Sequence, residues 1–423
     1  MAKIGRRAWS VGLVLGLATA GSLVPAAAGA QQAPRHSVSA AITVVANGLN
    51  TPRGVLYDAR HHRVLVAEAG TFAADSGPCG TGEGGTTLCF GTSGSVFQYS
   101  LTSHSQRRII TGLPSEAASD GSAVLGLEAL SLYRHHLNGV FGLLGTPDTR
   151  AAFGPAGAAL GQVATLHRSG RADPFGDIAN YEIQQYGAGQ ESDPYDLVTG
   201  PYGTVVANAG GHAVFGNVGG NDLLLVRHGQ ISTLAAFPQR VPAENPKDIV
   251  ESVPTAVVRG PDGAFYVGEL TGYPYYKGEA RVWRVVPGQQ PTIYASGFTN
   301  IISMTFDHQG RLIVLEIAKN GLLDPDQTGA LIRVEHNGDQ TLLASTGMTN
   351  PGGVAAVGNG VFYVTNNTTS VNGTGQLLKS PLEADRELPH PGGRGARAGQ
   401  GPRTPAPVRR AQSSADMTCL MRV

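Results

Sequence analysis

The chain has 423 residues, with 31 lysines and arginines against 31 aspartates and glutamates, so its formal net charge is zero. A neutral balance argues against nucleic acid as a partner, because phosphate binding requires an excess of basic side chains. Charged residues make up 15% and hydrophobic residues 41%, which excludes a disordered polyelectrolyte and suffices for a large core. The 59 glycines and 26 prolines favour short strands joined by turns over long helices.

The first thirty residues have the pattern of an export signal. Lys3, Arg6 and Arg7 form a charged start, 8–24 is an apolar run without charge, and 28–30 offers small residues for cleavage. A membrane anchor is the alternative, but the apolar run is short and the small residues follow it directly. No later segment is long and apolar enough to span a bilayer. We therefore expect a cleaved signal peptide and a protein that is secreted or held in the cell envelope.

The cysteines favour one disulfide bond. Cys79 and Cys89 lie in a stretch rich in Gly, Thr and Ser, and Cys419 is far away near the end of the chain. An oxidising compartment favours pairing Cys79 with Cys89. A zinc site is not favoured, because no second pair of Cys or His follows at ligand spacing.

A repeat of about fifty residues runs through the chain. Its clearest copies are 253–269, 302–316 and 353–366, each with a short apolar strand, a tight turn containing Gly, and a second strand. Asp262–Gly263 and Asn359–Gly360 at these turns are typical of hairpins, because Gly readily takes positive φ. Third and fourth strands follow, and four antiparallel strands per repeat predict a propeller blade.

Six copies predict an all-β, six-bladed propeller over residues 42–380. Looser copies begin near Pro52, Leu127 and Pro194. The last copy lacks a fourth strand, and Thr43–Leu49 resembles the fourth strands of other copies. We therefore expect the N-terminal strand to pair into the last blade and close the ring, which would cover its open sheet edge. A β-sandwich is the alternative, but the turn and strand order recurs too regularly for it.

Beyond Ser380 the sequence becomes rich in Gly, Pro and Arg and loses apolar periodicity, which predicts a disordered tail. A misread reading frame is the other explanation of this segment. The predicted organisation is a signal peptide (1–30), a linker (31–41), the propeller (42–380) and the tail (381–423).

Residues 251–285 resemble the signature of the ScyD/ScyE family of exported, NHL-like propellers, named after biosynthesis of the pigment scytonemin. Further similar stretches are 297–302, 181–182 and 193–195. The resemblance covers about residues 42 to 380 and implies the fold and export rather than a substrate. In the family an Asp often occupies the position of Ser303 in this chain, so a role for that carboxylate does not transfer.

Polar side chains recur where the second strand of each blade ends. These ends lie on the same face as the starts of the first strands, because antiparallel neighbours reverse direction. The residues are Glu68, Asn208, Glu269, Glu316 and Asn366, with Leu144 at this place in blade 2. Carboxylate and amide oxygens are ligands that calcium prefers, and propeller lactonases hold such an ion in the channel. Glu68, Asn208, Glu269 and Glu316 are therefore candidate calcium ligands, and hydrogen bonding to loop N–H groups is the alternative.

The first strands supply a second ring of residues, nearer the channel axis. It consists of Arg53, Glu128, Tyr195, Thr255, Ile302 and Gly352, which do not form a calcium cage. The segments 191–194 and 251–254, both of which begin Glu-Ser, lie between blades on the same face. They either line the channel mouth with acids or satisfy loop N–H groups, and the second interpretation is favoured.

The loop 271–278 carries Tyr273 and Tyr275 close after Glu269. Tyrosines near a channel rim suit a flat or apolar ligand, through stacking and hydrogen bonds. Packing over the neighbouring blade is the alternative.

No nucleophile elbow, Walker loop, His-Glu-x-x-His or Cys-x-x-Cys motif is present, so no catalytic residue is assigned. The sequence favours a module that binds an unknown small molecule or protein at one face of the channel. Its candidate ligand-binding residues are Glu68, Asn208, Glu269, Tyr273, Tyr275, Glu316 and Asn366. The alternatives are a calcium-dependent lactonase or hydrolase, a propeller oxidoreductase and a protein-interaction platform.

Overall fold

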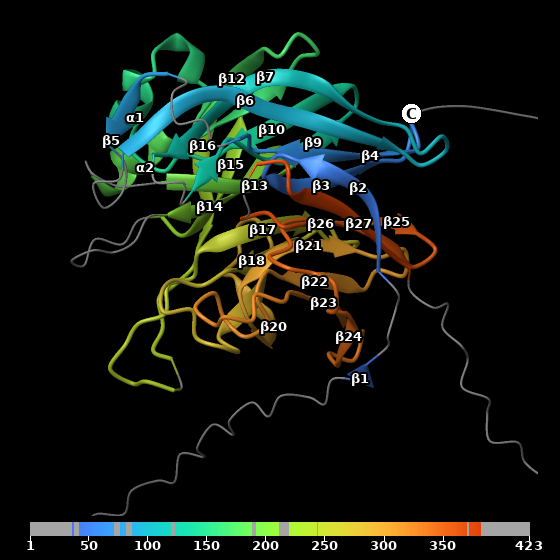
Figure 1. Ribbon diagram of the computed structural model, residues 1–423. Coiled ribbons are helices and arrows are strands. Elements are labelled where there is room, and N and C mark those ends of the chain that lie inside the picture. Colours follow the sequence, from blue (N-terminus) through green and yellow to red (C-terminus); the bar gives the residue numbers. More distant parts are fainter. Residues whose placement is uncertain are drawn as a thin grey trace, which may run out of the picture. The chain divides into compact units, whose positions relative to one another are not determined.

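The computed structural model describes residues 36–37, 42–71, 77–81, 87–119, 123–187, 192–210, 220–242, 244–369 and 372–381. The predicted signal peptide, the predicted tail beyond residue 381 and Cys419 lie outside these residues. The described chain is nearly all β and forms six sheets (Figure 1). Its short helices are α1 (Pro147–Ala152), a 3₁₀ turn (Pro155–Gly157) and α2 (Ile178–Tyr186). None of the described helices is both long enough and apolar enough to cross a bilayer.

The six sheets are the six predicted blades, and in each the chain passes from an inner strand at the channel to outer strands at the rim. Blade 1 contains β3 (Pro52–Asp58), β4 (Arg63–Glu68), β6 (Thr87–Ser100) and β7 (Gln106–Ala118), with β5 (Cys79–Thr81) beside β6 and β8 (Val124–Leu125) beside β7. Blade 2 contains β9 (Leu127–Tyr133), β10 (His136–Phe141), β11 (Gln162–Leu166) and β12 (Ala172–Asp177), and blade 3 contains β13 (Ser192–Gly200), β14 (Gly203–Gly210), β15 (Asp222–Arg227) and β16 (Gln230–Ala236). Blade 4 contains β17 (Pro254–Arg259), β18 (Phe265–Glu269), β19 (Ala280–Val285) and β20 (Thr292–Phe298), and blade 5 contains β21 (Ile301–Phe306), β22 (Leu312–Glu316), β23 (Ala330–Val334) and β24 (Gln340–Ala344), with β1 (His36–Ser37) parallel to β24. Blade 6 contains β25 (Val354–Gly358), β26 (Val361–Asn366), β27 (Gly375–Pro381) and, at its outer edge, β2 (Thr43–Leu49).

The N-terminal strand β2 completes the last blade, as predicted. It pairs antiparallel with β27, and Thr43 lies opposite Lys379 and Val44 opposite Leu378. β27 reaches Pro381, one residue into the segment expected as tail. Residues more than 300 positions apart thus form one sheet, and the edge of β27 is covered.

Six hydrophobic clusters fill the spaces between blades, one for each neighbouring pair. Successive side chains of a strand point to opposite faces, so each strand serves two interfaces. Leu65 packs against blade 2, whereas its neighbours Val64 and Val66 pack against blade 6. The cluster between blades 6 and 1 includes Leu49 of β2 and Leu377 of β27, so strand pairing and core packing both close the ring.

Polar side chains of the inner strands also connect blades. Asp196 accepts a hydrogen bond from Val257 N at 2.8 Å, and Ser303 accepts one from Val354 N at 3.2 Å. Both side chains therefore hold the inner strand of the next blade, and burial raises the pKa of Asp196 to about 7. At position 303 a serine hydroxyl makes this connection without a carboxylate.

All six inner strands line a central cavity of about 440 Å³. The strands approach each other closely at Gly54, where an added Cβ would lie 3.0 Å from Ala129 Cα. Glycine at position 54 therefore lets two neighbouring inner strands pack closely at the wall of this cavity.

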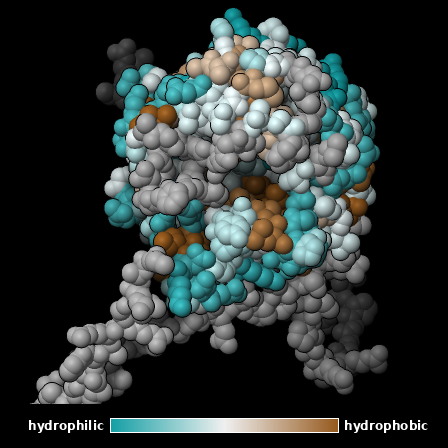
Figure 2. Space-filling model, turned by 60° about the vertical axis from the view of Figure 1, so that its left-hand side comes forward, coloured by the Kyte–Doolittle hydropathy of each residue, from teal (hydrophilic) through white to brown (hydrophobic). Residues whose placement is uncertain are grey.

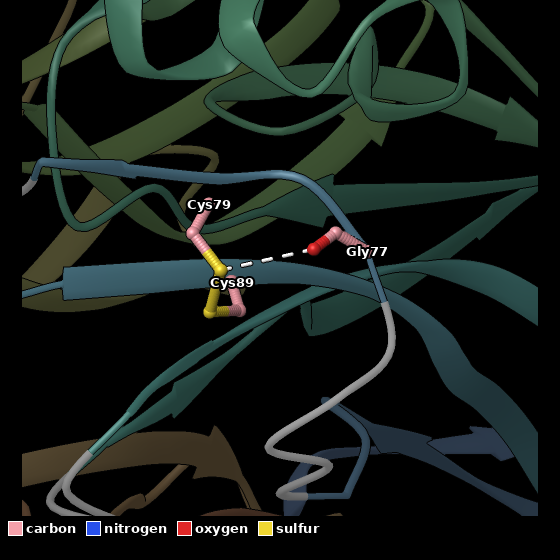
Figure 3. The surroundings of a disulfide bond; sticks show 3 residues. All are labelled: Gly77, Cys79 and Cys89. Atoms are coloured by element: carbon pink, nitrogen blue, oxygen red, sulfur yellow. Dashed lines mark hydrogen bonds between the residues drawn. A yellow bond between two sulfur atoms is a disulfide. The ribbon is translucent and has the colours of Figure 1, made fainter.

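Cys79 of β5 and Cys89 of β6 form the predicted disulfide bond, with an S–S distance of 2.08 Å (Figure 3). They are opposite each other in the β5–β6 ladder, and Cys79 Sγ lies 3.7 Å from the Gly77 carbonyl oxygen. The bond attaches the 77–81 segment to blade 1. A disulfide fits a protein of an oxidising compartment.

Candidate functional site

The starts of the inner strands and the ends of the second strands share one face of the propeller. Helices α1 and α2 lie on this side (Figure 1). Figure 2 turns this side forward and shows a hollow with hydrophobic atoms at its floor and hydrophilic atoms around it. The side chains near the channel opening on this face are therefore the candidates for contact with a ligand.

The strand-end residues are buried and hold the segments between blades. They are Glu68, Asn208, Glu269, Glu316 and Asn366, each at most 3% exposed. Glu68 accepts a hydrogen bond from Asn50 N at 2.7 Å, Glu316 from Thr299 N at 2.7 Å and Asn366 from Thr349 N at 2.7 Å. In each case the donor belongs to the link that enters the same blade.

Glu68, Glu269 and Asn208 also have side-chain partners. Arg108 forms two hydrogen bonds with Glu68, at 2.7 and 2.8 Å. Glu269 binds Arg240 at 2.8 Å and accepts from Ser252 Oγ at 2.8 Å and from Trp283 Nε1 at 2.6 Å. Asn208 accepts from Ser192 Oγ at 2.8 Å and donates to the Gly220 carbonyl oxygen at 3.0 Å. These contacts are the ones expected from the loop-bonding alternative.

The structure does not gather the strand-end residues into a metal site. Among the described residues, no group of three or more His, Cys, Asp or Glu side chains is placed to hold a metal ion. Glu68 and Glu269 are already paired with arginines. The donor set therefore does not fit calcium, and no chemistry is assigned through such an ion.

The two tyrosines of the 271–278 loop differ in environment. The Tyr273 side chain is 65% exposed, and its ring meets the ring of Tyr275 edge-on at 6.1 Å between centroids. The carbonyl oxygen of Tyr275 is 3.1 Å from where a Cβ on Gly321 would be, so this loop lies against blade 5. Only Tyr273 presents most of its ring to solvent.

A cluster of ionisable residues from three blades lies at the channel mouth. Arg53 Nε of β3 is 3.0 Å from Glu128 Oε2 of β9, and the charge of Arg53 also acts on Tyr195 of β13. Asp193 of β13 and Glu116 of β7 complete the cluster, since the charges of Glu128 and Glu116 both act on Asp193. We call these five residues the mouth cluster.

Burial dominates the electrostatics of the mouth cluster. Glu116 and Glu128 are each 1% exposed. Burial, and then the charge of Glu128, raises the pKa of Asp193 to about 8 and that of Glu116 to about 7. Burial also raises the pKa of Glu128, although Arg53 opposes this effect. Three carboxyl groups thus share one guanidinium, and the cluster retains protons near neutral pH.

Three carboxyl oxygen atoms of the mouth cluster are buried without a hydrogen-bond partner among the described residues: Asp193 Oδ1, Glu116 Oε2 and Glu128 Oε2. Glu128 Oε2 lies 3.0 Å from Arg53 Nε in an ion pair, which leaves Asp193 Oδ1 and Glu116 Oε2. The other oxygen of Glu116 accepts from Leu144 N. The nearby Leu143 N–H group lowers the pKa of Asp193, against the larger effect of burial. Because a buried polar atom without a partner is unfavourable, these two atoms are the places where a ligand group would stabilise the site most.

Glycine at position 142 makes room for Asp193. A Cβ at this position would lie 2.5 Å from Asp193 Oδ1 and 3.2 Å from Glu128 Cγ. Any larger side chain at position 142 would therefore displace the carboxyl groups of Asp193 and Glu128. The arrangement of the mouth cluster thus depends on a glycine directly after β10.

The opposite side of the mouth is apolar. Tyr195 packs against a cluster of blades 5 and 6 that includes Ile302 and Ile317, with Leu270 and Leu322 beside it. Tyr195 therefore stands between a polar side formed by blades 1 to 3 and an apolar side formed by blades 4 and 5. This arrangement suits a ligand with hydroxyl groups on one side and hydrocarbon on the other.

Part of the mouth cluster was predicted from the sequence. Arg53, Glu128 and Tyr195 were expected around the channel, and Asp193 belongs to the 191–194 segment for which a structural role was favoured. Glu116 was missed. It reaches the site because β6 and β7 extend far beyond the other outer strands, and Glu116 pairs with Leu125 of β8, close to Glu128.

A second pair of buried carboxyl groups joins α2 to blade 3. Glu182 accepts from Gly220 N at 2.9 Å, and burial together with the nearby Asp222 raises the pKa of Glu182 to about 9. Burial raises the pKa of Asp222 to about 7, although Asn208, Thr233 and Tyr186 lower it. This pair holds the helix in place beside the mouth.

No protein-family model and no curated protein matches this sequence. The chain is similar in structure to a luciferin-regenerating enzyme (8% identity, TM-score 0.46, covering 81% of this chain and 95% of that one). It is also similar to a gluconolactonase from Xanthomonas campestris and to virginiamycin B lyase from Staphylococcus aureus. For each of these two, the sequence identity is 12%, the TM-score is 0.43, and the match covers 82% of this chain and 99% of the other. At such identities the likeness concerns the fold alone, and the resemblance to the ScyD/ScyE family stays a prediction.

Proposed function

We propose that this protein is an exported propeller that binds a small, hydroxyl-rich molecule with an apolar side at the channel mouth. The observation that carries the proposal is that Asp193 Oδ1 and Glu116 Oε2 are buried without a hydrogen-bond partner in the part of the chain that the structure describes. Carboxyl groups that retain protons near pH 7 donate as well as accept hydrogen bonds, as sugar-like hydroxyl groups do. The disulfide bond supports export, since it fits an oxidising compartment.

The contacts of the site assign roles to its residues. Arg53 and Tyr195 would donate to ligand oxygens, Asp193 would bind a hydroxyl group, and Ile302 would contact the hydrocarbon side. Tyr273 stays a proposed rim contact because its ring is exposed. Glu68, Asn208, Glu269, Glu316 and Asn366 are proposed to shape the mouth through the interblade links rather than to touch the ligand.

Titration calorimetry with monosaccharides, their lactones and simple aromatic alcohols tests this proposal. Asp193→Asn should weaken the binding of any compound that binds by about tenfold or more. The amide would lose the hydrogen bond that the buried Asp193 carboxyl group makes to a ligand hydroxyl group, or would reverse its donor and acceptor. Asp339→Asn, in the exposed β23–β24 turn, is the matched control. If both variants bind as well as the parent protein does, the mouth cluster is not the binding site.

A hydrolase without a metal ion is the second candidate. It is favoured by two neighbouring carboxyl groups with pKa values raised to about 8 and about 7. Such a pair supplies a general acid and a general base in the same pH range. In ester or lactone hydrolysis Glu116 would take a proton from the attacking water, and Asp193 would give one to the leaving alkoxide. Turnover of lactones by the purified protein in the presence of chelator, lost in Asp193→Asn, distinguishes this candidate from binding alone.

A further inference from the structure

A second cavity lies on the other face of the propeller, between blades 2 and 3. Its volume is about 470 Å³. Residues of the turns β9–β10, β13–β14 and β15–β16 line it. Because neighbouring strands are antiparallel, these turns lie on the face of the propeller away from the channel mouth. It shares no residue with the mouth cluster, so its role is independent of the function proposed above.

Two arginines give the rim of this cavity a positive charge. Arg134 and Arg227 line it together with His136 and His228, and all four residues are exposed. Among the described residues that line the cavity, none is acidic. The carboxylate of Asp173, in β12, is bound by His167 at 2.9 Å and Arg171 at 2.9 Å.

Two other blades neutralise an arginine on this face. Blade 1 pairs Asp58 with Arg63 at 2.8 Å, and blade 5 pairs Asp307 with Arg311 at 2.8 Å. In both, an aspartate at the turn between the first two strands supplies the charge. Blade 2 has Arg134 at its corresponding turn, and no described residue forms an ion pair with Arg134 or Arg227. The positive charge of the cavity is therefore uncompensated within the described chain.

The interior of the cavity combines a flat apolar wall with a polar floor. Phe175 and Tyr133 contribute rings, and Arg134 lies over the ring of Tyr133 at 5.3 Å. At the floor, Asn138 Nδ2 donates to Thr199 Oγ1 at 3.3 Å, and Thr165 Oγ1 donates to Asn138 Oδ1 at 3.1 Å. The floor is thus internally bonded and rigid, while the rim side chains have free donors.

We propose that this cavity binds a small organic anion, a phosphate ester or carboxylate with a planar apolar body. Arg134 and Arg227 would bind the anionic group, since a guanidinium matches phosphate and carboxylate in a two-pronged geometry. The planar body would lie against Phe175 and Tyr133. The cavity volume is in the range of small-molecule sites.

Calorimetry with phenyl phosphate, inorganic phosphate and benzyl alcohol tests the proposal on the full-length protein. We expect saturable binding of phenyl phosphate, weaker binding of phosphate and none of benzyl alcohol. Arg134→Gln with Arg227→Gln should weaken phenyl phosphate binding at least tenfold, because a charge-assisted hydrogen bond is lost at each position. Arg107→Gln, which removes an exposed arginine of β7, should leave it unchanged.

Phe175→Leu separates the two halves of the site. It should weaken phenyl phosphate several-fold and leave inorganic phosphate unchanged. Thermal melts establish that each variant is folded. The proposal is overturned if phenyl phosphate does not saturate by about 10 mM, if Arg107→Gln weakens binding as much as the double variant does, or if phosphate alone binds as tightly as its phenyl ester.

Discussion

Arg53 and Glu128 form an ion pair between the first two inner strands of the ring, with Arg53 Nε 3.0 Å from Glu128 Oε2. The carboxylate is 1% exposed and the arginine side chain 14% exposed. The pair therefore joins two blades and supplies the one guanidinium that three carboxyl groups share. Its removal should affect both the stability of the fold and the protonation of the mouth cluster.

Arg53→Met should destabilise the protein by about 3 kcal/mol at pH 8, because it leaves a buried carboxylate without its partner. The loss should be smaller at pH 5, since without Arg53 the pKa of Glu128 rises further and the group is neutral there. Urea unfolding at the two pH values measures the difference. Arg171→Met, which removes a 65% exposed arginine from Asp173, should change stability by less than about 1 kcal/mol.

The raised pKa of Asp193 predicts that stability falls with rising pH. The folded state raises this pKa from 3.8 to about 8, so between these values it binds a proton that the unfolded chain releases. The contribution is fully present below about pH 4 and is lost as pH rises through about 8. The urea midpoint should therefore be lower at pH 8.5 than at pH 5, and Asp193→Asn should reduce this difference. An unchanged difference in the variant would show that Asp193 does not titrate in this range.

The contacts of Glu269 predict a structural effect. Glu269→Ala should cost about 3 kcal/mol, because the buried Arg240 would lose its closest carboxylate and keep only Glu279, at 3.5 Å. The two tryptophans of the chain are Trp9, in the predicted signal peptide, and Trp283, whose Nε1 donates to Glu269. The emission of Trp283 should shift in this variant and stay constant in Glu244→Gln, an exposed control. If ligand binding changes while stability and emission do not, Glu269 belongs to a binding site after all.

Closure of the ring predicts a large effect of Leu49. Its side chain is fully buried between blades 6 and 1, so Leu49→Ala should destabilise the protein by about 2–5 kcal/mol. Val44 of the same strand is 48% exposed, and Val44→Ala should have little effect. Deleting residues 42–49 should uncover the edge of β27 and cause aggregation, measured by light scattering. A monomeric deletion variant with an unchanged melting temperature would contradict the role of β2.

The strands were predictable because their signals are local. Asp-Gly and Asn-Gly turns between apolar strands mark the hairpins, and the spare strand Thr43–Leu49 indicated that the ring closes. The mouth cluster was only partly predictable, because its members come from three blades. Glu116 depends on the exceptional length of β7, and the pKa of Asp193 depends on Glu128 and on Gly142 beside it. The roles of Glu68 and Glu269 depend on Arg108 and Arg240, which no spacing connects to them.

The pairing of β2 with β27 also sets the order in which the molecule can be completed. β2 leaves the ribosome, or the export channel, among the first segments of the propeller, and its partner Gly375–Pro381 emerges near the end of it. Until then β2 has no strand to pair with. Final closure must therefore follow synthesis of all six blades, so a chaperone that shields Thr43–Leu49 during this interval should raise the yield of native protein more than one that acts on finished blades.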